Sequence, residues 1–242
     1  MIDMHERLAG FGIAPKIFGI SSYTLFVALG IVAGLVYYMR DAEKRQVKGE
    51  GVIEIISAAL IFGVIGSKIP IILEGGSFQN ILFGKSIVGG LIGGYIGVRL
   101  IKKKMKISLK MGNIIAPAVA LGMSIGRMGC FFNGCCVGKV GMFGCNFGDG
   151  QLRYPTQLFE VAFHLAAFFI LHNQRNRVMK PGILFRYYIF SYFIFRFFIE
   201  FIRINPVIWV GLTIYQIFSV GVIIYMGYGI LQESKSNVDK LQ

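Results

Sequence analysis

Arginine and glutamate side chains interrupt stretches of this sequence that are otherwise apolar. Arg127 follows residues 111–125, which carry no charge, and Arg196, Glu200 and Arg203 share one helical face at i, i+4 and i+7. A guanidinium keeps its proton, so an arginine within an apolar layer needs a partner or a wet cavity. Paired arginines suit phosphate, because the planar fork offers bidentate hydrogen bonds. These residues predict an anion site, although an internal ion pair that only neutralises the helix is the alternative for Arg196 and Glu200.

The composition indicates an α-helical membrane protein. Hydrophobic residues make up 55% of the 242 residues and charged residues 15%, whereas a soluble domain carries about 25% charge. The 32 glycines are typical of membrane helices, and the alternating pattern of a membrane β-barrel is absent. A net charge of +13 could suggest nucleic acid as a partner. We expect no nucleic acid, because the basic residues fall between apolar runs and so fit topology signals and contact with anionic lipid.

We therefore expect an all-α fold, a polytopic integral membrane protein with about seven transmembrane helices, since about 20 apolar residues cross a bilayer. The expected spans lie near 17–39, 52–73, 84–101, 112–134, 156–172, 182–202 and 208–231. The third is glycine-rich, so it either crosses fully or is partly re-entrant. No repeat or linker divides the chain, so residues 1–242 are expected to form a single transmembrane domain.

The distribution of basic residues predicts the orientation. They concentrate after the first, third and fifth spans and in the C-terminal tail, so the positive-inside rule places the N-terminus outside and the C-terminus in the cytoplasm. The longest external loop, 135–155, is glycine-rich and is either a flexible loop or a lid over an outward-facing site. The residues assigned to the cytoplasmic side are Arg40, Lys44, Arg45, Lys48, Lys102, Lys103, Lys104, Lys106, Lys110, Arg175, Arg177, Lys180, Lys235 and Lys240.

The intramembrane polar residues are expected at a common depth. At about 1.5 Å per helical residue, Tyr23, Arg127 and Arg196 all lie roughly 9–10 Å below the outer boundary. Cations outnumber carboxylates at this level, so the sequence predicts a cavity that opens to the outer leaflet and attracts an anion. The other positions expected near this depth are Lys68, Gly89, Gly90, Gln157 and Glu160.

Four cysteines, Cys130, Cys135, Cys136 and Cys145, occur in one short segment. Neither the CxxC spacing of a zinc site nor a secreted disulfide framework is present, so no metal is expected. A disulfide to Cys145 is one interpretation, and buried thiols that act as small hydrophobic side chains are another.

The sequence resembles the prolipoprotein diacylglyceryl transferase family from about residue 17 to residue 230. Segment 126–134 reads Gly-Arg-Met-Gly-Cys-Phe-Phe-Asn-Gly and is similar to the family's G-R-x-G-N-F-x-N-G signature. Seven spans with an external N-terminus are also typical of the family. The other matching segments are 21–23, 88–94, 114–117, 154–160 and 195–203.

The resemblance implies transfer of a diacylglyceryl group from phosphatidylglycerol to the thiol of a lipobox cysteine, with release of glycerol phosphate. The expected partners are phosphatidylglycerol, the preprolipoprotein signal peptide and membrane lipids, with no cofactor, in the bacterial inner (plasma) membrane as a multi-pass protein. Arg127, Arg196 and Tyr23 are the expected catalytic residues. The expected substrate-binding residues are Lys68, Gly89, Gly90, Asn133, Gly138, Gln157, Glu200 and Arg203.

Several positions depart from the family pattern. Val88 and Tyr154 stand where the family usually has histidine, Cys130 where it has asparagine, Cys135 where it has glutamate and Lys68 where it has arginine. The arginines are thus retained while the groups that could handle a proton are not. Cys130 and Cys135 become candidate reactive thiols, because a nearby arginine favours the thiolate.

The three histidines, His5, His164 and His172, are expected in core or interfacial roles. Three functions remain open: a divergent transferase, a paralogue that moves a lipid-derived or other group to a different acceptor, and a non-enzymatic membrane protein that binds lipid or signal peptide.

Overall fold

The computed structural model describes residues 12–45, 51–75, 78, 81, 86–107, 111–177 and 180–238, with side chains up to residue 232. Expectations placed on His5, Lys48, Lys110, Lys240, residues 84–85 and the side chain of Lys235 lie outside this part of the chain. The described helices are α2 (Ser22–Lys44), α3 (Val52–Gly66), α4 (Ile69–Leu73), α6 (Ile87–Lys104), α7 (Gly112–Asn133), α8 (Thr156–Gln174), α9 (Ile183–Ile199), the 3₁₀ helix η1 (Glu200–Ile202) and α10 (Ile214–Val238).

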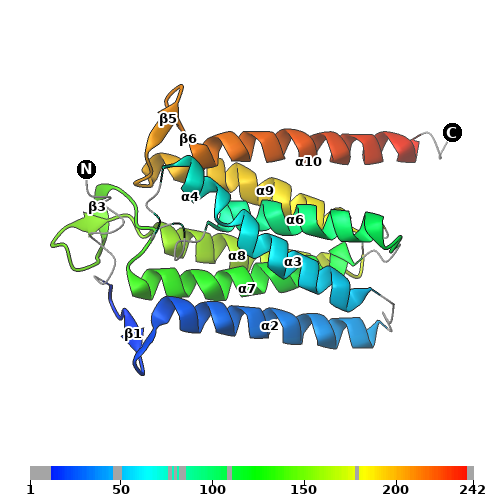
Figure 1. Ribbon diagram of the computed structural model, residues 1–242, viewed down its shortest axis with the longest axis horizontal. Helices are drawn as coiled ribbons and strands as arrows, with labels where there is room; N and C mark the ends of the chain where they lie inside the picture. Colours follow the sequence, from blue (N-terminus) through cyan, green and yellow to red (C-terminus); the bar gives the residue numbers. More distant parts are fainter. Residues whose placement is uncertain are drawn as a thin grey trace.

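The long helices lie side by side with roughly aligned axes and run alternately in opposite directions (Figure 1). Three short antiparallel hairpins gather at one end, which we call the hairpin end (Figure 1). They are β1 (Lys16–Ile17) with β2 (Ile20–Ser21), β3 (Val140–Asn146) with β4 (Leu152–Arg153), and β5 (Val207–Trp209) with β6 (Leu212–Thr213). The first hairpin leads into α2 at this end, whereas α10 finishes at the opposite end.

Within the described ranges, four helical segments are long and apolar enough to cross a membrane: Ser22–Lys44, Val52–Leu73, Gly112–Asn133 and Ile214–Gln232. They overlap the first, second, fourth and seventh expected spans, but the first helix begins at Ser22 rather than residue 17 and the last at Ile214 rather than residue 208, because a short hairpin precedes each. The other three expected spans hold α6, α8 and α9, which are shorter or more polar. Helix α9 has 17 residues, α6 ends in three lysines, and α8 buries Gln157, Glu160 and His164.

The apolar surface of the bundle fits a lipid environment. Only 17% of the residues in the apolar parts of α2 and α10 are buried, and Leu29, Val32 and Ile224 are among the large apolar side chains left exposed. In water such a surface would be a liability, but hydrocarbon leaves it favourably solvated. The structure is therefore that of a mostly helical membrane protein.

Close packing explains the glycines of the third expected span, which forms a continuous helix of 18 residues rather than a broken segment. A Cβ atom on Gly66 would lie 2.7 Å from the Cα of Gly93, and one on Gly89 would lie 2.7 Å from the ring of Pro70. Because real Cβ atoms do not approach so closely, α3 and α6 can meet only through glycine at these positions.

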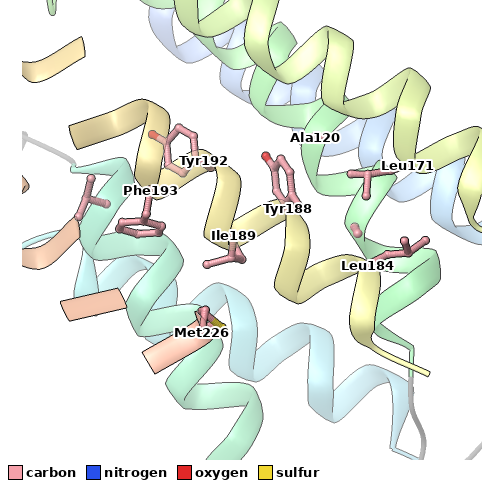
Figure 2. Close-up of a cluster of buried hydrophobic side chains, with 10 residues drawn as sticks. Ala120, Leu171, Leu184, Tyr188, Ile189, Tyr192, Phe193 and Met226 are labelled. Carbon is pink, nitrogen blue, oxygen red and sulfur yellow. The ribbon is translucent and has the colours of Figure 1, made fainter. Parts of the chain in front are cut away.

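The main apolar core surrounds α9. Tyr188, Tyr192 and Phe193 are almost fully buried there, against residues of α6, α7, α8 and α10 (Figure 2). Val88 of α6, at 1% exposed, belongs to this core. This packing fixes the rotation of α9 and so directs the other polar side chains on its buried face.

Candidate active site

The site is organised around Glu160, a fully buried carboxylate in the first turns of α8. Arg127 from α7 forms an ion pair with Glu160 Oε2. Arg196 Nη1 and Arg203 Nη1 lie 3.2 Å and 3.1 Å from Glu160 Oε1. Tyr192 donates a 3.4 Å hydrogen bond to Glu160 Oε2. One carboxylate therefore holds together arginines that are up to 76 residues apart in sequence.

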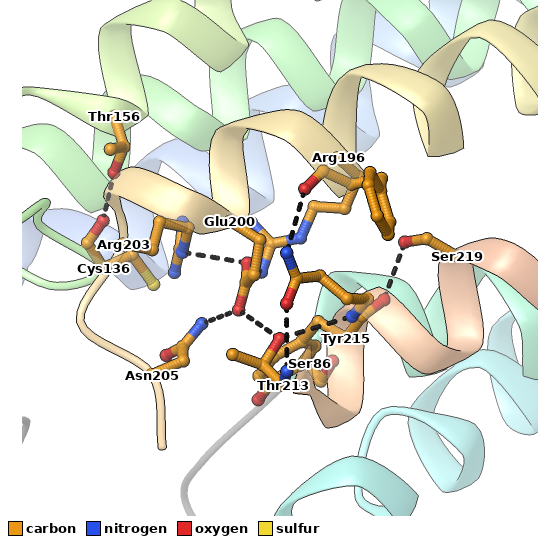
Figure 3. Close-up of polar contacts among 12 residues, drawn as sticks. Ser86, Cys136, Thr156, Arg196, Glu200, Arg203, Asn205, Thr213, Tyr215 and Ser219 are labelled. Atoms are coloured by element: carbon orange, nitrogen blue, oxygen red, sulfur yellow. Dashed lines mark hydrogen bonds and ion pairs between the residues drawn. The ribbon is translucent and has the colours of Figure 1, made fainter. Parts of the chain in front are cut away.

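Glu200 supplies the second carboxylate. Its Oε2 lies 2.7 Å from Arg196 Nη2 and 3.7 Å from Arg203 Nε. Thr213 donates a 3.1 Å hydrogen bond to Oε1, and Asn205 donates to the same oxygen (Figure 3). Three arginines thus meet two carboxylates, which leaves one net positive charge in a buried region.

The backbone after α9 directs Arg203 into the cluster. The helix tightens into η1, and Arg203 follows in an extended conformation that forms a β-bridge with Gly138. A Cβ on Gly138 would lie 2.7 Å from Tyr154 and 2.9 Å from the Ile202 carbonyl oxygen. Glycine is therefore required where the 135–155 loop crosses the end of α9. This loop contains β3 and β4, and its Phe147 is fully buried.

Tyr23 and Asn133 lie at the adjoining contact between α2 and α7. Ser21 Oγ donates a 3.2 Å hydrogen bond to Asn133 Oδ1. A Cβ on Gly129 would lie 3.2 Å from the Cα of Tyr23 and 2.7 Å from Phe26. Gly129, two residues after Arg127, therefore allows the start of α2 to lie close against α7.

Three thiols border the arginines. The Sγ atoms of Cys130, Cys135 and Cys136 all lie within 4.8 Å of one another, and Arg127 Nη1 is 3.7 Å from Cys130 Sγ. All four cysteines are free, so the disulfide to Cys145 is not formed in this structure. The sequence singled out Cys130 and Cys135 as candidate reactive thiols, and the position of Cys136 beside them depends on the turn after α7.

The arginines are enclosed rather than open to one side. Arg127 and Arg196 are each 3% exposed, which differs from the expected open cavity, because the shared Glu160 draws the guanidinium groups together. The Nε atoms of Arg127 and Arg196 have no hydrogen-bond partner among the described residues. Buried donors without partners are rare, and here they mark capacity for an anionic ligand.

Three of the residues expected at this depth lie at the bend of the second span and at its contact with α6. Lys68 lies where the second span bends between α3 and α4, just before Pro70, and Gly89 packs against Gly66 and Pro70. Gly90 faces the same α3 surface. Gln157, in contrast, lies beside the thiols, with its Nε2 donating a 2.6 Å hydrogen bond to the Cys135 carbonyl oxygen.

Comparison with known proteins places this site in a family. A sequence profile described as prolipoprotein diacylglyceryl transferase matches residues 12–231. The chain belongs to the prolipoprotein diacylglyceryl transferase family. A phosphatidylglycerol–prolipoprotein diacylglyceryl transferase of Clostridium tetani is 33% identical over 79% of this chain and 82% of that protein. One of Rickettsia africae is 32% identical over 93% and 95%, and one of Streptococcus uberis is 30% identical over 86% and 88%.

The region matched by the prolipoprotein diacylglyceryl transferase family includes the enclosed arginines and the adjoining thiols, and segment 126–134 contributes Arg127 and Cys130 to them. Of the histidines, His164 is fully buried one helical turn from Glu160, with Nδ1 3.0 Å from the Tyr188 hydroxyl. His172 lies toward the far end of α8, with Nδ1 2.7 Å from the Tyr37 hydroxyl. Both positions fit the core or interfacial role expected for them.

The residue that sequence reasoning placed least well is Glu160. Its signal was present, since a carboxylate in an apolar span needs a cationic partner. From the sequence, Glu160 was expected only as one of the negative charges at the same membrane depth as the arginines. The sequence could not show that all three arginines converge on this one carboxylate.

Proposed function

We propose that this chain transfers a diacylglyceryl group from phosphatidylglycerol to the thiol of a lipobox cysteine in a preprolipoprotein. The observation that carries the proposal is that Arg127 and Arg196, both inside the region matched by the family, contact one buried carboxylate, Glu160. The names of the relatives state the donor lipid and the protein substrate. Family membership makes a transferase the best interpretation.

The charge balance supports a phosphate ligand. The cluster has one more arginine than carboxylates, and phosphatidylglycerol carries one negative charge on its phosphodiester. When the bond from carbon to phosphate oxygen breaks, the leaving glycerol phosphate gains a second charge. Arginines held in a buried, low-dielectric region stabilise that developing charge more strongly than water does. We assign this role to Arg127 and Arg196.

The neighbouring residues have supporting roles in this proposal. Glu200 and Arg203 position Arg196 and the phosphate, and Gly138 lets the 135–155 loop cross Arg203. Tyr23 and Asn133, at the contact of α2 with α7, line the side where the acceptor thiol approaches. Gln157 holds the turn that carries Cys135. We assign Lys68, Gly89 and Gly90 to the lipid side of the site, near the α3–α6 contact.

Transfer is tested with the purified full chain in liposomes. The assay supplies a lipobox peptide and phosphatidylglycerol, and measures the peptide mass and the glycerol phosphate released. We expect the peptide mass to increase by one diacylglyceryl group for each glycerol phosphate released. We expect no reaction when serine replaces the peptide cysteine or when phosphatidylethanolamine replaces phosphatidylglycerol. Tight peptide or lipid binding without release of glycerol phosphate would contradict transfer and favour a binding protein.

We further propose that residues 1–242 form one domain that crosses the bacterial inner membrane seven times. Segments α2, α3–α4, α6, α7, α8, α9 and α10 would be the crossings. Their alternating directions support this number, as do the basic residues at the ends of α2, α6 and α8 away from the hairpin end. The hairpin end would then face outward and the C-terminus the cytoplasm.

This orientation predicts which introduced cysteines react in intact cells. In a chain whose native cysteines are replaced by serine, a cysteine at Gly150 or Trp209 is expected to react with a membrane-impermeant maleimide. One at Lys104 or Arg177 is expected to react only after the cells are opened. Labelling of a cysteine introduced at position 104 in intact cells would contradict the proposed orientation, and with it the outward-facing site.

A further inference from the structure

The three cysteine thiols are brought together by one turn. Helix α7 ends at Asn133, and Gly134 adopts a left-handed conformation with φ of 72°. Cys136 also has a positive φ of 63°, which is uncommon for a residue with a side chain. The Cys135 N–H donates a 3.1 Å hydrogen bond to the Cys130 carbonyl oxygen. The turn thereby folds Cys135 and Cys136 back toward Cys130, although their spacing in the sequence matches no common metal motif.

Helix α8 fixes this turn from the other side. Gln157 Nε2 donates a 2.6 Å hydrogen bond to the Cys135 carbonyl oxygen. Thr156 Oγ1 donates a 2.6 Å hydrogen bond to the Cys136 carbonyl oxygen (Figure 3). Both Thr156 and Gln157 are fully buried. The three sulfur positions are therefore held by surrounding structure, as the ligands of a preorganised metal site are.

The surrounding charge suits a thiolate cluster. Arg127 Nη1 is 3.7 Å from Cys130 Sγ, and Arg203 acts electrostatically on Cys136, beside which it lies (Figure 3). Three thiolates with one Zn²⁺ carry a single net negative charge. The arginine cluster carries a single net positive charge, because three arginines meet two carboxylates. Before the donor lipid binds, burial of such a metal centre is therefore electrostatically compensated.

We propose that Cys130, Cys135 and Cys136 bind a Zn²⁺ ion whose fourth position accepts the thiol of the protein substrate. Thiolates select soft or borderline metal ions, and zinc in catalytic sites takes three protein ligands with one exchangeable position. A metal ion can be bound by cysteine, histidine or carboxylate side chains. Among the described residues, these three cysteines form the one group of three or more such side chains that is close enough to share an ion. The proposal that these cysteines bind zinc does not depend on the transfer reaction, whereas the role of the fourth position rests on the proposed function.

The reaction step follows from the position of the thiols beside Arg127. The acceptor thiol binds zinc as a thiolate and releases its proton to water. Its sulfur attacks the glycerol carbon that carries the phosphate, so a carbon–sulfur bond forms as the bond from carbon to phosphate oxygen breaks. The electron pair stays on the phosphate oxygen, and glycerol phosphate leaves from the arginines. No oxidant or reductant is needed.

Zinc content of the purified full-length protein tests the site without reference to activity. The protein is prepared under reductant, equilibrated with Zn²⁺ alone, freed of excess metal and analysed for metal per chain. We expect one zinc per wild-type chain. Cys130→Ser, Cys135→Ser and Cys136→Ser should each weaken zinc binding by at least about tenfold, since loss of an outer-shell partner alone costs 10–100-fold. Cys145→Ser is the matched control, because Cys145 lies outside the group, and it should bind as the wild type does.

A measurement on the unaltered chain covers the case in which a serine variant fails to fold. Co²⁺ in place of Zn²⁺ should give the intense near-ultraviolet charge-transfer absorption of cobalt–thiolate bonds. Absence of that band in the folded wild-type protein, or recovery of the three cysteines as a disulfide and a thiol under reductant, would overturn the site. Equal zinc loss in Cys145→Ser and in the three variants would do the same.

The role of the fourth position has its own readout. Removing zinc with a chelator should abolish transfer to the lipobox peptide, and adding Zn²⁺ back should restore it. Full transfer by zinc-free protein would overturn the activating role and leave the proposed function intact. Zinc bound by three thiolates in a chain that never transfers lipid would instead contradict the proposed function and leave the metal site intact.

Discussion

Alanine at Arg127 or Arg196 is expected to lower diacylglyceryl transfer by about 100-fold or more, the usual cost of removing one preorganised donor to a developing anion. Both guanidinium groups are 3% exposed and contact the same carboxylate. Lysine at either position should recover little, because it keeps the charge but loses the bidentate fork. Initial rates in the liposome assay measure the effect.

Arg99→Ala is the matched control, since Arg99 also lies in an apolar helix but on α6, where it borders a groove away from the cluster. Its rate should stay close to that of the wild type. Each variant must also remain folded in detergent, which thermal unfolding verifies. If folded Arg127→Ala and Arg196→Ala proteins kept near-normal rates, the phosphate would have to bind elsewhere.

Glu160→Gln is expected to have the largest effect on stability, about 3–5 kcal/mol, because it leaves buried arginines without their shared counter-charge. Glutamine has nearly the same shape, so the loss would reflect charge rather than packing. Unfolding of the protein in detergent by denaturant measures the change. Glu54→Gln in the first turn of α3 is the control and should alter stability by no more than about 0.5 kcal/mol.

A double-mutant cycle tests the same centre. The double variant carries Glu160→Gln and Arg203→Gln. Loss of Arg203 removes one of the positive charges that Glu160→Gln leaves without a counter-charge, so the double variant should be more stable than the sum of the two single effects predicts. The Arg203 Nη1 contact of 3.1 Å with Glu160 Oε1 is the interaction probed. Strict additivity would show that Arg203 and Glu160 do not interact in the folded protein.

Sequence reasoning reached the membrane class and the arginines because both depend on local information. Apolar runs define helices of spanning length, and a charge within such a run is visible in one dimension. The rise per residue then gives depth, which correctly associated Arg127 with Arg196. Depth does not give the rotation of a helix, however. Lys68 and Gly89 were grouped with the arginines for this reason, although they lie at the bend of the second span and at the α3–α6 contact.

Long-range contacts account for what the sequence left out. Glu160 becomes the centre only because α8 packs against α7 and α9, which no local pattern specifies. The thiols meet only because Gly134 and Cys136 adopt positive φ values. Spacing rules for metal sites assume common turns, so they gave no indication of this group.

The most direct measurement of the proposed function is made in bacterial cells depleted of their own diacylglyceryl transferase. The cells express this chain and a reporter lipoprotein, and the mass of the reporter's lipobox cysteine is determined. We expect a diacylglyceryl addition with the wild-type chain and none with an Arg127→Ala, Arg196→Ala double variant present at equal level. A chain that is inserted and folded in the membrane but leaves the reporter unmodified would contradict the proposed transfer.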